Sequence, residues 1–179
     1  MSAQNLQKPV NNPLVEEWNT PFQTPPFEQI KEEHYVPAFK YALAEAKSEL
    51  YRIKEAKTKA TFENTIVALE HSGQLLNRIS GIFFNLLEAN TSDEMQRIAQ
   101  EISPMLTEFG NDIHLDPALF NRVRYVYEHH GELASDQKML LEKTYKSFVR
   151  EGANLSDEDK EKLRKIDMRS DWYRPALLD

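Results

Sequence analysis

The most informative feature of the chain is a series of apolar positions spaced three and four residues apart. That spacing places the apolar side chains on one face of an α-helix. The first such face predicts a helix that starts at about residue 32, with Pro37 near its beginning, where a missing backbone N–H is tolerated. Its apolar positions are Val36, Phe39, Leu43, Ala46, Leu50 and Ile53.

A second helix is predicted from Thr61, a suitable N-cap residue, to Leu87. It is apolar on two adjacent stripes, so several neighbours must cover it and we expect it at the centre of the fold. Gly73 and Ser80 are small residues within the first stripe, which indicates a close crossing with another helix. The first stripe is Phe62, Ile66, Leu69, Gly73, Leu76, Ser80, Phe83 and Leu87, and the second is Leu75, Ile79, Ile82 and Leu86.

Four further helices follow, each opened by a capping signal. A capping box at residues 91–94, with Thr91 as the cap, opens a helix in which Pro104 predicts a bend. Asp116 with a proline behind it opens the fourth helix, Ser135 the fifth and Ser156 the sixth. Since no segment alternates with a period of two, the pattern predicts an all-α, antiparallel multi-helix bundle of about six helices. The expected ends of the third, fourth and fifth helices are Gly110, Asn111 or Ile113, then Gly131, then Gly152.

The two ends of the chain differ from this helical middle. Residues 1–30 hold five of the nine prolines and three large aromatic residues, so they predict a flexible start and an extended arm packed on the helical body. We expect the arm to be anchored by Trp18, Phe22 and Phe27. The helical domain spans residues 31–168. Residues 169–179 form a discordant tail, where either the last helix ends or the natural chain continues differently.

Composition narrows the function classes. The chain has 179 residues and a formal net charge of −7, which suits one domain and argues against nucleic acid as a partner. No apolar run is long enough to cross a membrane, and the first residues do not resemble a signal peptide. The expected compartment is therefore the cytoplasm, with the periplasm not excluded. The chain has no cysteine, so disulfides and thiolate chemistry are absent.

Candidate catalytic and metal-ligating residues are not found. The five histidines are His34, His71, His114, His129 and His130, and no two of them are four residues apart, as a zinc-binding His-Glu-x-x-His helix requires. The sequence thus assigns no catalytic residue, no cofactor-binding residue and no metal ligand.

The remaining charged groups have ordinary explanations. Glu45 with Glu49, and Asp157 with Glu161, are carboxylate pairs one helical turn apart, but interspersed lysines favour a solvated helix face over paired acid–base chemistry. A strip of cations could face an anion, although a solvated face is favoured again. The strip consists of Lys143, Lys146 and Arg150.

An ordered series of short sequences resembles the N-terminal region of the thimet oligopeptidase family of zinc metallopeptidases, in particular its oligopeptidase A and peptidyl-dipeptidase branch. The resemblance covers residues 12–168, and the order and spacing of the series make it specific. The series is NPL at 12–14, TPPF at 24–27, HYVPAF at 34–39, TFENTI at 61–66, FFNL at 83–86, ANT at 89–91, LEKTY at 141–145 and GANLS at 152–156.

The resemblance implies a largely helical enzyme with a deep channel that admits short peptides. It also implies zinc held by a His-Glu-x-x-His helix and a later glutamate, a portion that this sequence lacks. The chain is therefore expected to be a catalytically silent part of the channel wall or lid, cut short or frameshifted after residue 168, with apolar faces left open for self-association. The alternative is a self-sufficient helical module that binds a protein or peptide.

Overall fold

The computed structural model describes residues 7–173, with side chains described for residues 7–169. Over this range the chain forms helices and short helical turns and no strand, which confirms the predicted all-α class. The helices are α1 Tyr35–Lys54, α2 Ala68–Glu70, α3 Gln74–Ala89, α4 Asp93–His114, α5 Pro117–His129, α6 Ser135–Arg150 and α7 Asp157–Tyr173.

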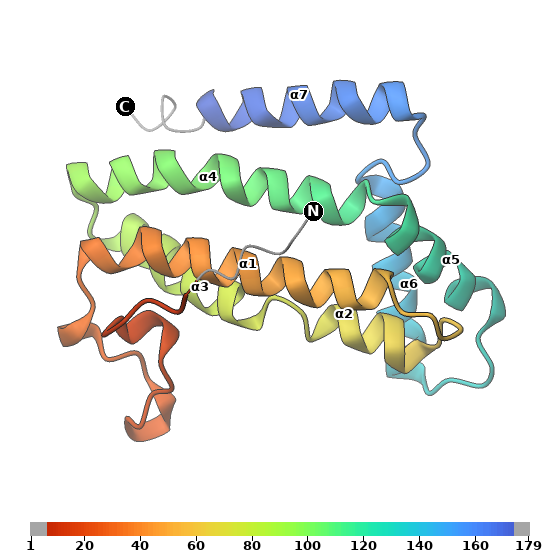
Figure 1. Cartoon of the computed structure of the whole chain (residues 1–179), viewed down its shortest axis with the longest axis horizontal. Helices are drawn as coiled ribbons and strands as arrows, with labels where there is room; N and C mark the ends of the chain where they lie inside the picture. The colour runs from red at the N-terminus through yellow and green to blue at the C-terminus, as the bar shows by residue number, and fades with distance from the viewer. Residues whose placement is uncertain (1–6, 174–179) are drawn as a thin grey trace.

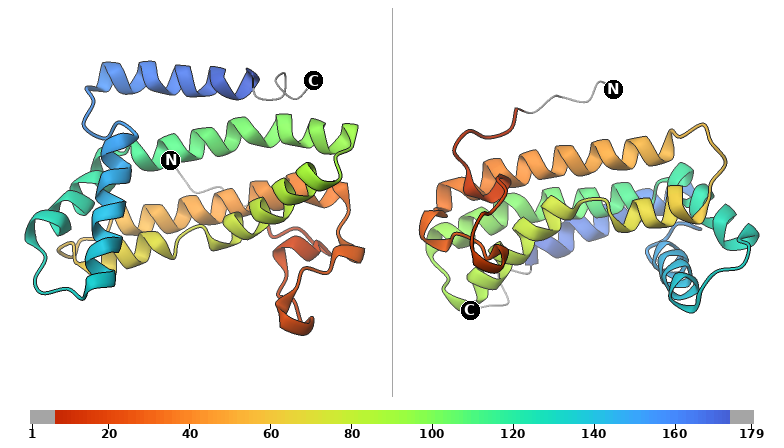
Figure 2. Two further views of the ribbon diagram at one scale, coloured as in Figure 1. Left: turned by 180° about the vertical axis from the view of Figure 1, so that it is seen from behind. Right: turned by 90° about the horizontal axis from the view of Figure 1, so that it is seen from below.

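The long helices form an elongated body whose two ends are built differently (Figure 1). α1 lies between α3 and α4, and α7 lies on the far side of α4, where it packs against that helix. The colour ramp of Figure 1 shows that α1 and α3 run in opposite directions, as do α4 and α7, whereas α1 and α4 run the same way. α5 and α6 pack together across one end, and the N-terminal segment lies at the other (Figure 2). No helix of the described chain has the length and apolar character that crossing a membrane would need.

The centre of the fold is α1, rather than the second predicted helix. α1 contacts α3, α4, α5 and the turn η1 Pro13–Val15. Alanines at one-turn intervals on α1 leave room for neighbouring helices to approach closely. The Phe83 ring of α3 then meets Tyr35 and Phe39 edge-on, with ring centroids 4.9 and 5.7 Å apart. The buried alanines of α1 are Ala38, Ala42 and Ala46.

The helix predicted from Thr61 to Leu87 is not continuous. Thr61 is its N-cap, as expected, and its side chain accepts a hydrogen bond from the Asn64 backbone N–H. The chain then forms a π-helical segment, η5 Phe62–Val67, followed by α2 and a turn. Gly73 takes a left-handed conformation with φ +69° and separates α2 from α3. The prediction of one continuous helix was wrong. The apolar positions before and after Gly73 keep their helical spacing in the sequence although the backbone turns at this glycine, so the spacing does not reveal the break.

Of the four other predicted helix caps, two are observed and two are replaced by a neighbouring residue. Asp116 caps α5 and Ser156 caps α7, each by accepting backbone N–H bonds as predicted. The cap of α4 is Ser92 rather than Thr91, and its oxygen accepts the Met95 N–H at 3.0 Å. Ser135 is the first residue of α6 and not its cap. α4 itself continues through its proline to His114.

The arm prediction was partly wrong. The N-terminal segment is a series of short turns, and Leu14 and Val15 are the buried residues that fix it to the body. Trp18 is partly buried and packs against the core, as expected. Phe22 is 98% exposed and Phe27 is 53% exposed, so neither of them anchors the segment.

The C-terminal part joins the body through the turn that follows α6. Gly152, with φ +97°, donates its N–H to Val149, and Ala153 donates to Phe148 in the pattern of a Schellman motif. α7 then continues past Met168 to Tyr173. Of the tail predicted at 169–179, residues 174–179 lie outside the described residues.

Candidate functional site

The larger of two described hollows is a groove of about 910 Å³ between the N-terminal segment, α1 and α3. Glu16 and Glu17 come from the segment, Glu45 and Glu49 from α1, and Arg78 from α3. Other lining groups include Lys8, Asn19, Tyr41, His71 and Gln74. The groove therefore carries more carboxylates than cations.

Arg78 fixes the N-terminal segment to the body at the edge of this groove. Its Nη2 donates to the carbonyl oxygens of Leu14 at 2.9 Å and Glu16 at 3.2 Å, and its guanidinium lies 4.3 Å from the centre of the Trp18 ring. Burial lowers the pKa of Arg78, an effect partly offset by the negative charge of Glu45. The cation thus replaces the water that two backbone carbonyls would otherwise bind.

Glu49 connects α1 to the turn between α2 and α3. Its Oε2 accepts the Gly73 N–H at 2.7 Å. A charged acceptor makes this a strong hydrogen bond, and it fixes the backbone where the second predicted helix breaks. One member of the Glu45–Glu49 pair therefore has a structural role, while the exposed Glu45 faces the groove.

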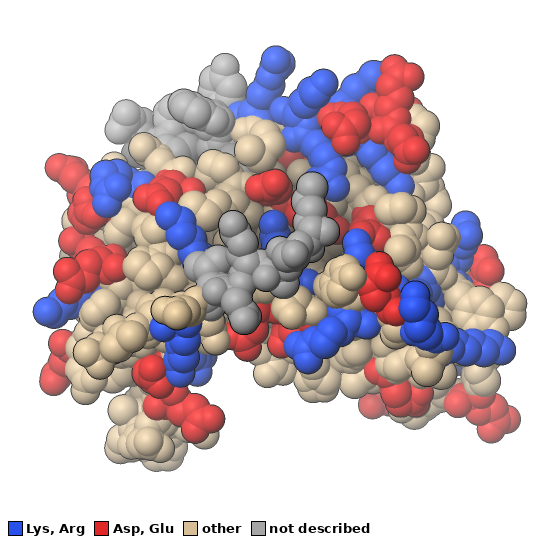
Figure 3. All heavy atoms as spheres, in the orientation of Figure 1, with Lys and Arg blue, Asp and Glu red and all other residues tan. Residues whose placement is uncertain are grey.

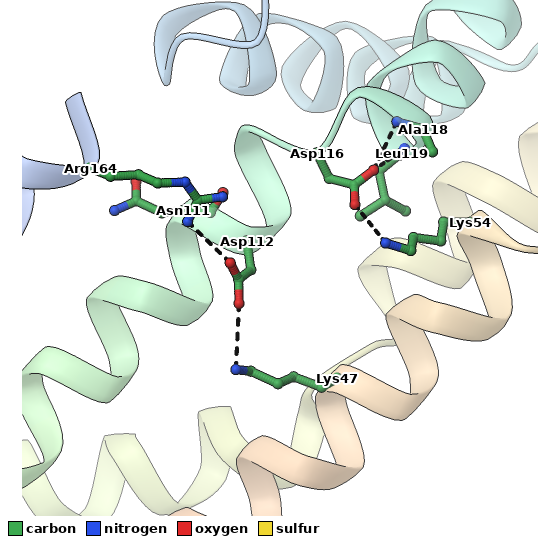
Figure 4. A network of polar contacts seen from close by, with 8 residues as sticks. All are labelled: Lys47, Lys54, Asn111, Asp112, Asp116, Ala118, Leu119 and Arg164. Atoms are coloured by element: carbon green, nitrogen blue, oxygen red, sulfur yellow. Dashed lines mark hydrogen bonds and ion pairs between the residues drawn. The ribbon is translucent and has the colours of Figure 1, made fainter. Parts of the chain in front are cut away.

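A network of ion pairs connects four helices on another part of the molecule (Figure 4). Asp112 of α4 lies 3.4 Å from Lys47 of α1 and 3.1 Å from Arg164 of α7. Asp116 pairs with Lys54 at 2.8 Å. Burial raises the pKa of Asp116, but Lys54 and the capped backbone N–H groups outweigh it and hold the pKa below its usual value. These contacts explain how the helices are held together and do not form a reactive centre.

Arg122 has a comparable structural role. It donates to the carbonyl oxygens of Ala56 and Thr58, both at 3.1 Å, and to the side-chain oxygen of Asn64 at 3.0 Å. Burial lowers the pKa of this guanidinium. Arg122 thereby connects α5 to the loop between α1 and η5.

The histidines are dispersed, and none of them pairs with another. His34 precedes α1, His71 lies in the turn after α2, and His129 and His130 are exposed at the end of α5. His114 stacks edge-on against Phe148 and its Nδ1 lies 3.1 Å from the Gly110 carbonyl oxygen. Among the residues that the structure describes, no group of three or more His, Asp or Glu side chains could hold a metal ion. The described residues therefore do not provide the three converging ligands that a zinc ion needs.

The other charged candidates lie in solvent. Asp157 and Glu161 are both exposed on α7, and the predicted cation strip is exposed along α6, where Lys146 pairs with Glu142 at 3.0 Å. On the face shown in Figure 3, acidic and basic side chains are interspersed, without a field of one sign. The predicted carboxylate pair of α7 and the predicted cation strip of α6 are thus both parts of solvated helix faces.

Comparison with known proteins identifies relatives of the chain by sequence identity. No family model matches it. It is 37% identical over 161 residues to dipeptidyl carboxypeptidase of Salmonella typhimurium, an alignment covering 89% of this chain and 24% of that protein. The corresponding protein of Escherichia coli is 38% identical over 155 residues, covering 86% and 23%. Oligopeptidase A of Escherichia coli is 26% identical over 176 residues, covering 95% and 25%.

The chain therefore spans about a quarter of the length of these relatives. Both kinds of relative are those that the ordered short sequences of residues 12–168 indicate. With nearly all of its residues aligned to them, the chain is homologous to about a quarter of dipeptidyl carboxypeptidase and of oligopeptidase A, which are members of the thimet oligopeptidase family.

Proposed function

We propose that this chain is the N-terminal helical part of an oligopeptide-cleaving zinc metallopeptidase, in which it forms part of the wall or lid of the substrate channel. The observation that carries the proposal is the alignment itself. It covers 89% of this chain but only 24% of a dipeptidyl carboxypeptidase. The zinc centre of such an enzyme then lies in the remaining three quarters of the polypeptide.

The residue content supports the further proposal that the chain alone is catalytically silent. Hydrolysis by a zinc enzyme needs a metal that lowers the pKa of its bound water and polarises the peptide carbonyl. Holding that metal takes three converging protein ligands. The 179 residues contain no two histidines four apart, and the described residues bring no three ligand side chains together.

The groove beside Arg78 is our candidate for a peptide-facing wall. It is a hollow of about 910 Å³, and its lining carries carboxylates and cations together with amides such as Asn19 and Gln74. Short peptides present an ammonium group, a carboxylate and unpaired backbone groups, all of which such a lining can bind. Short peptides are therefore the proposed partners of the complete enzyme, in the cytoplasm or, as the alternative, the periplasm.

A self-sufficient binding module remains the second candidate. One observation favours it, because nearly all buried apolar side chains of the described residues belong to one hydrophobic cluster. A module of this kind would bind its partner without any further polypeptide. Self-association through uncovered faces is a prediction that accompanies the first proposal and not the second.

A chimera distinguishes the two proposals. In the Salmonella dipeptidyl carboxypeptidase, the segment that aligns with this chain is replaced by the aligned residues of this chain. We expect the chimera to release dipeptides from short peptides in a chelator-sensitive reaction, and the enzyme lacking the segment to release none. A chimera that folds, judged by circular dichroism and gel filtration, but does not cleave would contradict the proposal.

A further inference from the structure

The N-terminal segment carries a projecting loop, residues 20–27, which we call the finger. It extends away from the helices at the end of the molecule opposite α5 and α6 (Figures 1 and 2). We call the turn η2 Pro21–Gln23 the tip of the finger. The Phe22 side chain in this turn is 98% exposed, and the Phe27 ring at the end of the loop is 53% exposed. Two phenyl rings in solvent on one short loop are unusual, because each exposes a large apolar surface.

The finger is rigid by construction. Three prolines fix its backbone, at positions 21, 25 and 26. Thr24 donates its hydroxyl to the Pro21 carbonyl at 3.0 Å, Gln23 N–H donates to Thr20 at 3.0 Å, and the Thr20 hydroxyl donates to the Thr24 carbonyl. The loop therefore holds its tip residue in one position instead of letting it fold back on the body.

The base of the finger is fixed as firmly. Trp18 donates its indole N–H to the Pro13 carbonyl at 2.7 Å and lies under the Arg78 guanidinium. The Asn12 side chain donates to the His34 carbonyl at 2.8 Å and accepts the Leu14 N–H at 3.1 Å. The segment is thus mounted on α1 and α3, and its exposed tip is not the result of a loose attachment.

The tip residue is held in an unfavourable backbone conformation. Phe22 has φ +58° and Gln23 has φ +54°, in the left-handed region that favours glycine. A phenylalanine at such a position gains nothing from contacts within this chain, because its ring touches solvent on nearly all sides. Strained backbone conformations of this kind persist where the surrounding structure enforces them, and they cluster at functional sites such as ligand contacts.

We propose that the finger is a docking element whose Phe22 ring enters an apolar pocket on the remaining three quarters of the peptidase polypeptide. This inference rests on the proposed function. The relatives are about four times as long as the part that this chain matches, so a large polypeptide surface is available to cover the finger.

The surroundings of the finger define the chemistry of the pocket. A hollow of about 460 Å³ lies at its base, lined by residues that include Trp18, Thr20 and Pro26. Glu17 lines the same hollow and Glu28 follows the finger, so both carboxylates lie near the contact. The surface of the remaining polypeptide that receives the finger should therefore have an apolar pocket for the Phe22 ring and basic residues around it to pair with the two carboxylates. A neighbouring side chain of that polypeptide should fill the hollow at the base of the finger.

The test uses hydroxyl-radical footprinting of the Phe22 peptide in two samples, the isolated chain and the Salmonella chimera. In the chimera we expect the oxidation rate of Phe22 to fall about tenfold, as its exposure drops from 98% to that of a residue in an interface core. Phe22→Asp should leave the melting temperature of the isolated chain unchanged and lower that of the chimera, and Phe22→Leu should restore it.

The outcomes separate this inference from the proposed function. An active chimera in which Phe22 reacts as fast as in the isolated chain overturns the docking proposal alone. A chimera that folds, judged by circular dichroism and gel filtration, but has no activity overturns the proposed function and the docking proposal with it. Gel filtration of the isolated chain gives a third outcome, because a dimer that Phe22→Asp abolishes would make a second copy the occupant and would overturn the proposal.

Discussion

Replacement of Gly152 by alanine is expected to destabilise the fold, for two reasons that the turn after α6 makes explicit. Gly152 has φ +97°, which L-residues rarely adopt. An added Cβ would also lie 2.8 Å from Leu155 Cδ1 and 2.9 Å from Leu163 Cδ2. Both distances are shorter than van der Waals contact, so the leucine side chains would have to move.

The expected cost combines these two effects. The left-handed conformation costs an L-residue about 1–2 kcal/mol. Displacing two leucine tips in a packed site costs about 1 kcal/mol more, at the low end for overpacking because the ends of the side chains can rotate. The sum is about 2–3 kcal/mol, which for a chain of this size lowers the melting temperature by about 4–12 °C.

Urea unfolding followed by circular dichroism measures this free energy of unfolding. Gly81→Ala is the matched control, because Gly81 lies within α3 and an added Cβ there would meet nothing within 4 Å. That variant should gain about 0.5–1 kcal/mol, since alanine is the better helix former. If Gly152→Ala were as stable as the natural chain, the conformation and packing described for this turn would be refuted.

Three further predictions concern the anchoring and capping residues. Leu14→Ala should cost about 2–5 kcal/mol in urea unfolding, because the side chain is completely buried against the body. Ser92→Ala should lower the free energy of unfolding by about 1 kcal/mol and Thr91→Ala by less than about 0.5 kcal/mol, since Ser92 is the cap of α4. Asp116→Asn should destabilise the fold at pH 7 because it loses the charge that Lys54 contacts. The pKa of Asp116 is lower in the folded than in the unfolded state, so the charged carboxylate stabilises the fold above the unfolded-state pKa and loses this effect as the pH falls. Urea unfolding from pH 7 to pH 3 should therefore show the free energies of unfolding of Asp116→Asn and of the unaltered chain converge.

The sequence predicted most of the helices because their signals are local. Apolar residues at steps of three and four identify α1, and the Asp116 cap with its following proline identifies the start of α5. What periodicity cannot show is the backbone conformation of one residue. Gly73 occupies a stripe position and still breaks the helix, because its positive φ is permitted by the missing side chain and fixed by Glu49.

Burial in the N-terminal segment was harder to predict. Aromatic residues among prolines suggest anchors, but of the three only Trp18 packs against the core, beside the buried Leu14 and Val15, while Phe22 lies in solvent. Which side of such a segment faces the body depends on contacts with residues far along the chain. The Arg78 hydrogen bonds to carbonyl oxygens some sixty residues earlier are of this kind, and no pattern near either partner predicts them.

The candidate groove shows the same limit. The carboxylate pair of Glu45 and Glu49 was identified from its spacing, but the groove forms only because the N-terminal segment returns to α1 and α3. Nothing in the spacing of Arg78 and Arg122 predicts that these two arginines fix distant segments of the chain. A cation between apolar helix positions is the one signal that could have indicated them, as with Arg78 between Leu76 and Ile79.

The most direct test of the central claim is a cleavage assay on the purified chain. The chain is incubated with short peptides and added zinc, with and without a chelator, and the products are identified by mass spectrometry. We predict no cleavage above background, because the sequence contains no two histidines four residues apart and the described residues bring no three ligand side chains together to hold the metal. Chelator-sensitive cleavage by the pure chain would contradict the account.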